Sequence, residues 1–97
     1  MRQITEQAVK AFYNREDFKK DNTEIVNTNG QTAFRLFGNT IAILNPDNKL
    51  LITDAGWQSK TTKERLNALD GVSITVKNFK WYLNKERWDG EWIEIKQ

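Results

Sequence analysis

The chain has 97 residues, which is the length of one domain (residues 1–97) and too short for two. It contains no cysteine and no histidine, so disulfides, thiolate nucleophiles and a Ser–His–Asp arrangement are excluded, and a metal site could use oxygen ligands only. Fifteen basic residues against thirteen acidic residues give a net charge of +2, which is a weak signal for any polyanionic partner.

The N-terminal segment is predicted to be a helix. Thr5 is suited to be its N-cap, and Ala8, Val9 and Phe12 form one apolar stripe. The polar run 19–22 is expected to end this element. The first residues lack the apolar run of a signal peptide, and no stretch approaches the roughly 20 apolar residues of a membrane helix, so we expect a soluble, cytoplasmic protein with no membrane partner.

The next segment predicts a hairpin. Asn29-Gly30 suits a type I′ turn, because both central residues of that turn need positive φ. Counting outward from the turn places Glu24 opposite Arg35 on the solvent face. The other face is expected to belong to the core, with Ile25, Phe34 and Leu36.

Two further strands are expected after a second turn at Gly38-Asn39. The runs 40–44 and 49–53 are almost continuously apolar, and 45–48 has the residues of a type I turn between them. Continuous apolar runs are typical of strands covered on both faces, so these are predicted to be the central strands.

A short second helix is predicted from Thr61. Thr61 would be the N-cap and Glu64 its capping-box partner, and Gly71 suits the left-handed residue that ends a helix. This phase predicts that Leu66 and Leu69 are buried and that Lys63 is exposed.

The last third of the chain predicts more strands. Apolar residues alternate at even positions in 72–76 and at odd positions in 79–83, so a bulge or tight turn is required near 77–78. Asp89-Gly90 is a hairpin-type pair that leads to a final strand over 92–95. The predicted order is α-β-β-β-β-α-β-β, an α+β fold with a single antiparallel sheet and two helices packed on it.

Catalytic residues are not apparent. Asp54 is the one aspartate at a strand end beside an irregular loop, but no histidine, cysteine or phosphate-binding loop accompanies it. We therefore expect a protein that is not an enzyme and that has no metal and no cofactor.

Four tryptophans are many for this length. Trp81 and Trp92 lie on apolar faces and are expected in the core. Trp57 and Trp88 lie in loop or turn sequence with polar neighbours, and each is either a core anchor or a contact residue.

The stretch 56–65 combines a helix N-terminus, hydroxyl groups, cations and an aromatic ring. This set suits a phosphate backbone or an acidic protein surface, although capping alone would explain the threonines. The candidate binding residues are Trp57, Lys60, Thr61, Thr62, Lys63, Arg65 and Trp88.

The motifs GNTIA (38–42), AGW (55–57), TTKERLNAL (61–69) and WYL (81–83) resemble a group of small bacteriophage-encoded proteins. The resemblance implies a small binding module of the host cytoplasm that binds a host or phage macromolecule, for example as an inhibitor of a host-defence protein.

Two hypotheses follow for the ligand. In the first, a protein partner is held by the loop and helix over 57–65. In the second, nucleic acid binds the region 57–87, which has seven basic and three acidic residues and a net charge of +4, leaving −2 for the rest of the chain. Salt distinguishes them, because binding to phosphates weakens steeply as salt rises.

Overall fold

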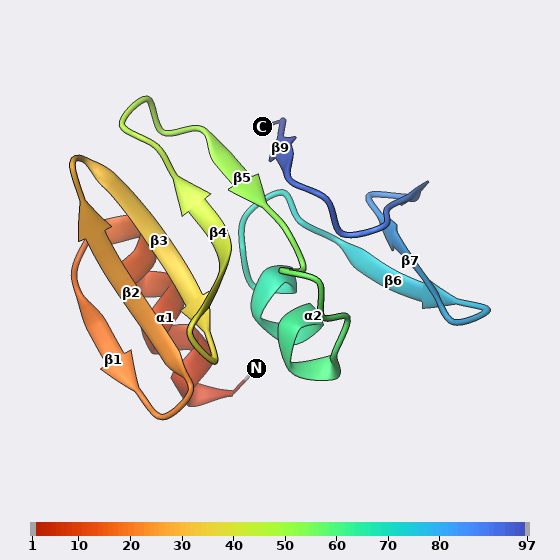
Figure 1. The fold of residues 1–97 in the computed structure, drawn as a ribbon, viewed down its shortest axis with the longest axis horizontal. Helices are drawn as coiled ribbons and strands as arrows, with labels where there is room; N and C mark the ends of the chain where they lie inside the picture. Colours follow the sequence, from red (N-terminus) through yellow and green to blue (C-terminus); the bar gives the residue numbers. More distant parts are fainter. Residues whose placement is uncertain (1, 97) are drawn as a thin grey trace.

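A computed structural model describes residues 2–96 and has the predicted α+β architecture (Figure 1). The strands form a six-stranded sheet and a three-stranded sheet, and all their pairings are antiparallel. In chain order the elements are α1 (Gln3–Asn14), β1 (Phe18–Lys20), β2 (Thr23–Thr28), β3 (Gln31–Leu36), β4 (Asn39–Leu44), β5 (Leu50–Ile52), α2 (Lys60–Asn67), β6 (Ile74–Lys77), β7 (Lys80–Leu83), β8 (Glu86–Arg87) and β9 (Ile93–Ile95).

The large sheet has the order β1-β2-β3-β4-β5-β9, so the C-terminal strand lies at its edge beside β5. The strands β6, β7 and β8 form the separate small sheet, where the sequence had predicted a continuation of one sheet. Helix α1 packs on one face of β1, β2 and β3, and α2 lies between β4 and β6 (Figure 1). Within residues 2–96, neither helix is long and apolar enough to cross a membrane.

The core lies between α1, α2 and the inner face of the large sheet. Phe12 of α1 is fully buried and meets Phe34 of β3 edge to face, with ring centroids 5.7 Å apart. The outer face is covered less completely than predicted, because Ile43 of β4 and Leu51 of β5 remain partly exposed. The central strands are thus fully buried on one face only.

The first hairpin matches its prediction. Asn29 and Gly30 have φ of 53° and 79°, as a type I′ turn requires. Glu24 pairs with Arg35, and Arg35 Nη1 lies 3.9 Å from Glu24 Oε1. Ile25, which pairs with Phe34, is buried with it.

Two other hairpins have the same turn conformation, with positive φ at both central residues, and one of these residues is phenylalanine. The β3–β4 turn is Phe37-Gly38, one residue earlier than predicted, and the register of the β3–β4 ladder shifts between Phe34 and Arg35. The turn between β6 and β7 is Asn78-Phe79, as the change in alternation required. Both phenylalanines have positive φ, 52° for Phe37 and 63° for Phe79.

The start of the chain differs from the prediction in two ways. Helix α1 begins at Gln3 after an N-cap, Arg2, that makes no side-chain cap bond. Thr5 is therefore not the cap; it is fully buried and bonds through its hydroxyl to Arg65 and Glu64 of α2. The polar run 19–22, expected to be a helix end, contributes to strand β1 and the turn after it.

Helix α2 begins at Lys60 and its cap is Ser59, whose Oγ accepts a hydrogen bond from the Thr62 N–H at 3.1 Å. The predicted cap at Thr61 is therefore wrong by two residues. Leu66 and Leu69 are buried as predicted, whereas Lys63 is half-buried and not fully exposed.

The C-terminal segment crosses from the small sheet back to the large one. Asp89-Gly90, predicted to be a hairpin turn, instead lies in the loop between β8 and β9. The Gly90 carbonyl accepts hydrogen bonds from the Asp54 N–H at 3.0 Å and from Thr53 Oγ1 at 2.6 Å. Trp92 beyond it is 47% exposed, so its predicted place in the core is wrong.

Candidate binding site

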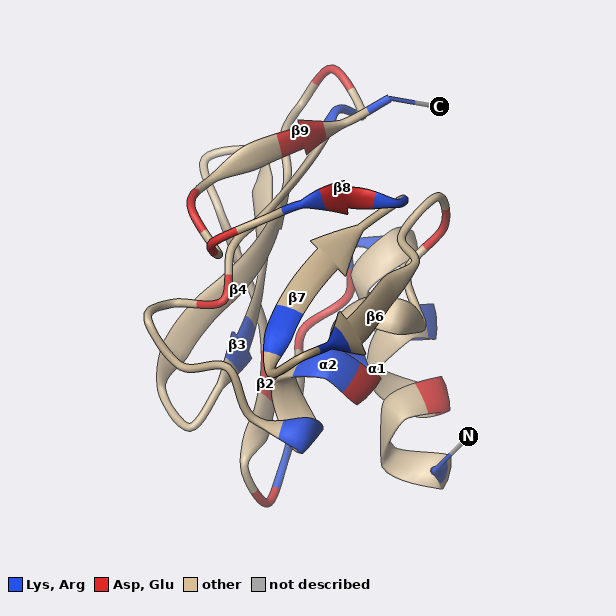
Figure 2. Ribbon diagram, turned by 90° about the vertical axis from the view of Figure 1, so that its right-hand side faces the viewer, with Lys and Arg blue, Asp and Glu red and all other residues tan. Residues whose placement is uncertain are grey.

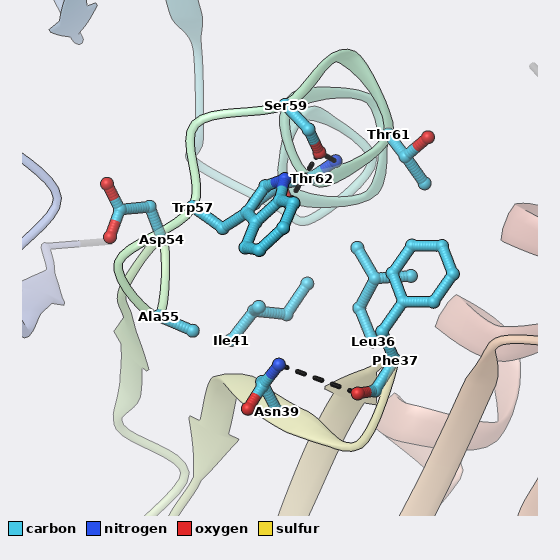
Figure 3. Close-up of a pocket in the computed structure, with 10 residues that line it drawn as sticks. All are labelled: Leu36, Phe37, Asn39, Ile41, Asp54, Ala55, Trp57, Ser59, Thr61 and Thr62. Carbon is cyan, nitrogen blue, oxygen red and sulfur yellow. Dashed lines mark hydrogen bonds between the residues drawn. The ribbon is translucent and has the colours of Figure 1, made fainter.

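A pocket of about 540 Å³ lies where the β3–β4 turn, the loop after β5 and the start of α2 meet (Figure 3). Three of the predicted binding residues line it: Trp57, Thr61 and Thr62. The other lining residues are Leu36, Phe37, Asn39, Ile41, Asp54, Ala55 and Ser59. We call this site the Trp57 pocket.

Two large aromatic side chains flank the Trp57 pocket. Trp57 is 70% exposed and Phe37 is 68% exposed, and Figure 3 shows them on opposite sides, with Leu36 and Ile41 between them. Leu36 and Ile41 are buried, so the floor is apolar and continuous with the core. The pocket thus offers an apolar floor between two exposed rings.

The loop after β5 holds Trp57 outward through a tight turn. Asp54 Oδ1 accepts a hydrogen bond from the Gly56 N–H at 2.6 Å, and the Asp54 carbonyl accepts one from the Trp57 N–H at 3.0 Å. Ala55 and Gly56 both have positive φ, 58° and 83°. The Asp54 carboxylate is buried and turned away from the pocket (Figure 3), and it accepts its hydrogen bond from the backbone of its own loop.

Hydroxyl groups at the start of α2 form the polar rim. Ser59 Oγ lies 3.0 Å from Thr62 Oγ1, and the Thr62 side chain is buried. Thr61 is partly exposed on the same rim. Because Ser59 already accepts from the Thr62 N–H, that amide of the helix start is not free for a ligand.

The three predicted cations of α2 have different environments. Lys60 is exposed and Lys63 is half-buried, but Arg65 is fully buried. The Arg65 guanidinium donates to Thr5 Oγ1 at 2.8 Å and to Thr23 Oγ1 at 3.3 Å, and it pairs with Glu64. Arg65 is therefore a structural residue of the core and cannot contact a partner.

Trp88 is also excluded from the binding surface. Its side chain is buried, its ring centroid lies 6.2 Å from that of Trp81, and its Nε1–H donates to the Glu91 carbonyl at 2.9 Å. The contact-residue alternative for Trp88 is therefore wrong, because its indole N–H is satisfied inside the fold. Trp81 is buried as predicted.

Phe37 is the exposed aromatic residue of the pocket that was not predicted from the sequence. A turn at Gly38-Asn39, as predicted, leaves Phe37 at the end of a strand. A signal was available, because burial of Phe34 and Leu36 on one face turns residue 37 away from the core. No group of three or more acidic, histidine or cysteine residues that could hold a metal ion occurs among residues 2–96.

A family of known proteins matches this chain. The sequence profile of the Kyanoviridae Gp96 protein family matches residues 1–96, nearly the whole chain. No curated protein and no solved structure matches. The match bears out the resemblance to phage-encoded proteins, while the family description names no activity.

Proposed function

The chain belongs to the Kyanoviridae Gp96 protein family of phage proteins, and we propose that it is a non-catalytic binding module that holds a protein partner in the Trp57 pocket. The phage context makes a host protein the expected partner, and a component of a host-defence system, inhibited by being bound, is the form of this proposal that we favour. The residues assigned to contact are Trp57 and Phe37 at the centre and Lys60, Thr61 and Lys63 around them.

The observation that carries the proposal is the exposure of Trp57 and Phe37 on either side of an apolar floor. A folded protein gains nothing by leaving two large rings in water, whereas aromatic side chains contribute most of the binding energy in many protein interfaces. Their spacing across one pocket suits an apolar side chain of a partner inserted between them.

The surroundings of the pocket support a protein ligand. Protein interfaces have an apolar centre and a polar rim, and here Thr61 lines the pocket beside the apolar floor, while Lys60, its neighbour in α2, is exposed. A rim cation such as Lys60 mainly accelerates association with an acidic surface and adds little to affinity. The partner surface is therefore expected to combine an apolar protrusion with acidic neighbours.

The test begins with tagged chain as bait in lysate of infected host cells, with and without nuclease treatment, followed by purification of the captured protein. Trp57→Ala should weaken the affinity for that protein by about 30-fold or more, the scale of an interface hot spot. Lys60→Ala should change mainly the association rate. Trp92→Ala is the matched control, because Trp92 is also exposed but lies outside the pocket.

Two results would contradict the proposal. One is a purified partner that binds Trp57→Ala and wild type with equal affinity. The other is capture that disappears when nucleic acid is digested, because a direct protein contact does not need it.

A further inference from the structure

The tip of the β6–β7 hairpin (residues 76–80, here the hairpin tip) has an aromatic residue where the backbone favours glycine. Phe79 occupies the second position of a type I′ turn with φ of 63°, and its side chain is 97% exposed. Asparagine followed by glycine is the favoured pair for this turn, as Asn29-Gly30 shows in the first hairpin. A phenylalanine in the left-handed region is strained, and at this exposure packing does not offset the strain.

Charge at the hairpin tip is also unfavourable for the isolated protein. Lys77 and Lys80 pair directly across the two strands, and both are exposed. Like charges facing each other in this way destabilise a hairpin. Strain at Phe79 and repulsion between the lysines would both be explained by an anionic partner that these residues contact.

The same side of the molecule carries further positive charge on α2. Figure 2 shows blue segments on the β6–β7 hairpin and on α2 below it, and α2 packs beside β6. Lys60 and Lys63 are the lysines of this helix. Glu64, the next residue along the helix, is paired with buried Arg65 and accepts from Thr5, so its charge is partly neutralised within the fold.

We propose that the hairpin tip is a binding site for single-stranded nucleic acid, in which Phe79 stacks on a base while Lys77 and Lys80 contact the flanking phosphates. A fully exposed ring offers the flat face on which an unpaired base stacks, and the lysines beside it supply the charge that follows the backbone. A duplex is disfavoured, because its bases are already stacked on one another.

This site is separate from the Trp57 pocket and does not depend on it. Phe79, Lys77 and Lys80 are absent from the pocket lining. An anionic membrane is the competing ligand, but one ring and the half-exposed Val76 give a narrow apolar tip, which is a weak membrane anchor.

The experiment measures binding of a labelled twelve-nucleotide oligothymidylate by fluorescence anisotropy at several salt concentrations. Phe79→Gly should weaken binding about tenfold or more, because it removes the stacked ring. Lys77→Gln and Lys80→Gln should each reduce the slope of log affinity against log salt by about 0.7. Because Phe79→Gly creates the favoured turn pair, its denaturation midpoint should equal or exceed that of the wild type, so lost binding cannot come from unfolding.

Lys20→Gln is the control. Lys20 is an exposed lysine on β1, which lies at the opposite end of the molecule from the hairpin (Figure 1), and this variant should bind the oligonucleotide as the wild type does. The proposal is overturned if the wild type does not bind the oligonucleotide at low salt, or if Phe79→Gly binds it equally well. It is also overturned if the wild type does not bind the oligonucleotide but binds vesicles rich in phosphatidylglycerol through Phe79.

Discussion

The carboxylate of Asp54 occupies the space above Gly90. A Cβ atom on Gly90 would overlap Asp54 Oδ2, and Gly90 has a φ of 95°. The Asp54 N–H also donates to the Gly90 carbonyl, so the two residues join the end of β5 to the segment that leads into β9. This contact gives Asp54 a structural role.

Gly90→Ala should destabilise the fold by about 2 kcal/mol or more, because it adds a steric clash to the strain of a positive φ. Gly38→Ala is the matched control: Gly38 has a φ of 80°, but no atom lies within 4 Å of its Cβ position. Urea denaturation should show a larger loss for Gly90→Ala than for Gly38→Ala. Equal losses would mean that the Asp54 carboxylate moves aside freely.

Among the charged residues, substitution of Arg65 should cause the largest loss of stability. Arg65→Leu leaves Thr5 and Glu64 without their buried partner, and breaking such a buried pair costs about 3–5 kcal/mol. Arg87→Leu is the control, because its ion pair with Asp89 is exposed and should contribute about 1 kcal/mol or less. Thermal or urea unfolding that ranks the two variants equally would contradict a structural role for Arg65.

The turns could be predicted from the sequence because the conformation of a turn depends mainly on the residues that form it. Asn29-Gly30 determines both the turn and the register of Glu24 with Arg35, and the structure confirms both. Thr5 and Arg65 could not be placed in this way. They lie 60 positions apart in the chain, and a threonine that can cap a helix can equally bond to a distant guanidinium.

The candidate site could be predicted only in part, because local sequence does not show which residues the whole fold buries. Trp57 follows a loop signal and lies at the surface, but the sequence around Trp88 has the same polar character although Trp88 is buried against Trp81. What separates them is the position of the small sheet, which depends on the whole fold. Phe37 was missed because its turn begins one residue earlier than glycine and asparagine suggest.

Alkaline pH should reveal the environment of Tyr13. Burial raises the pKa of this phenol above its ordinary value of 10.0. The hydrogen bond that the phenol oxygen accepts from the Asp70 N–H at 2.9 Å lowers the pKa, and the negative charge of Asp70 raises it. In the unfolded chain the phenol loses its proton first, so the stability contributed by the neutral form is complete below pH 10 and is lost as pH rises through the folded-state pKa.

The measurement is the free energy of unfolding in urea at a series of pH values above and below 10 for wild type and Tyr13→Phe. The wild type should lose more stability across this range than the variant does. Near neutral pH the free energy of unfolding of Tyr13→Phe should be lower than that of the wild type by about 1 kcal/mol, because the Asp70 N–H loses its acceptor. Two parallel curves would show that Tyr13 titrates as it does in the unfolded chain.

The last prediction separates stability from binding at Phe37. Phe37 has a φ of 52° and is 68% exposed, so the fold gains little from its ring and bears the strain of its backbone. Phe37→Asn places asparagine directly before Gly38, which is the pair that type I′ turns favour, and should raise the free energy of unfolding by about 0.5–1 kcal/mol. The same change removes one wall of the Trp57 pocket, so binding of the protein partner should weaken about tenfold or more while the fold becomes more stable.

Asn29→Phe is the reverse substitution at the equivalent turn position of the first hairpin. It should lower the stability of the fold without changing the affinity for the partner, because residue 29 lies outside the pocket. Urea denaturation and titration with the purified partner measure the two quantities on the same samples. A Phe37→Asn protein that is less stable than the wild type would show that the exposed ring serves the fold, and one that binds with unchanged affinity would remove Phe37 from the site.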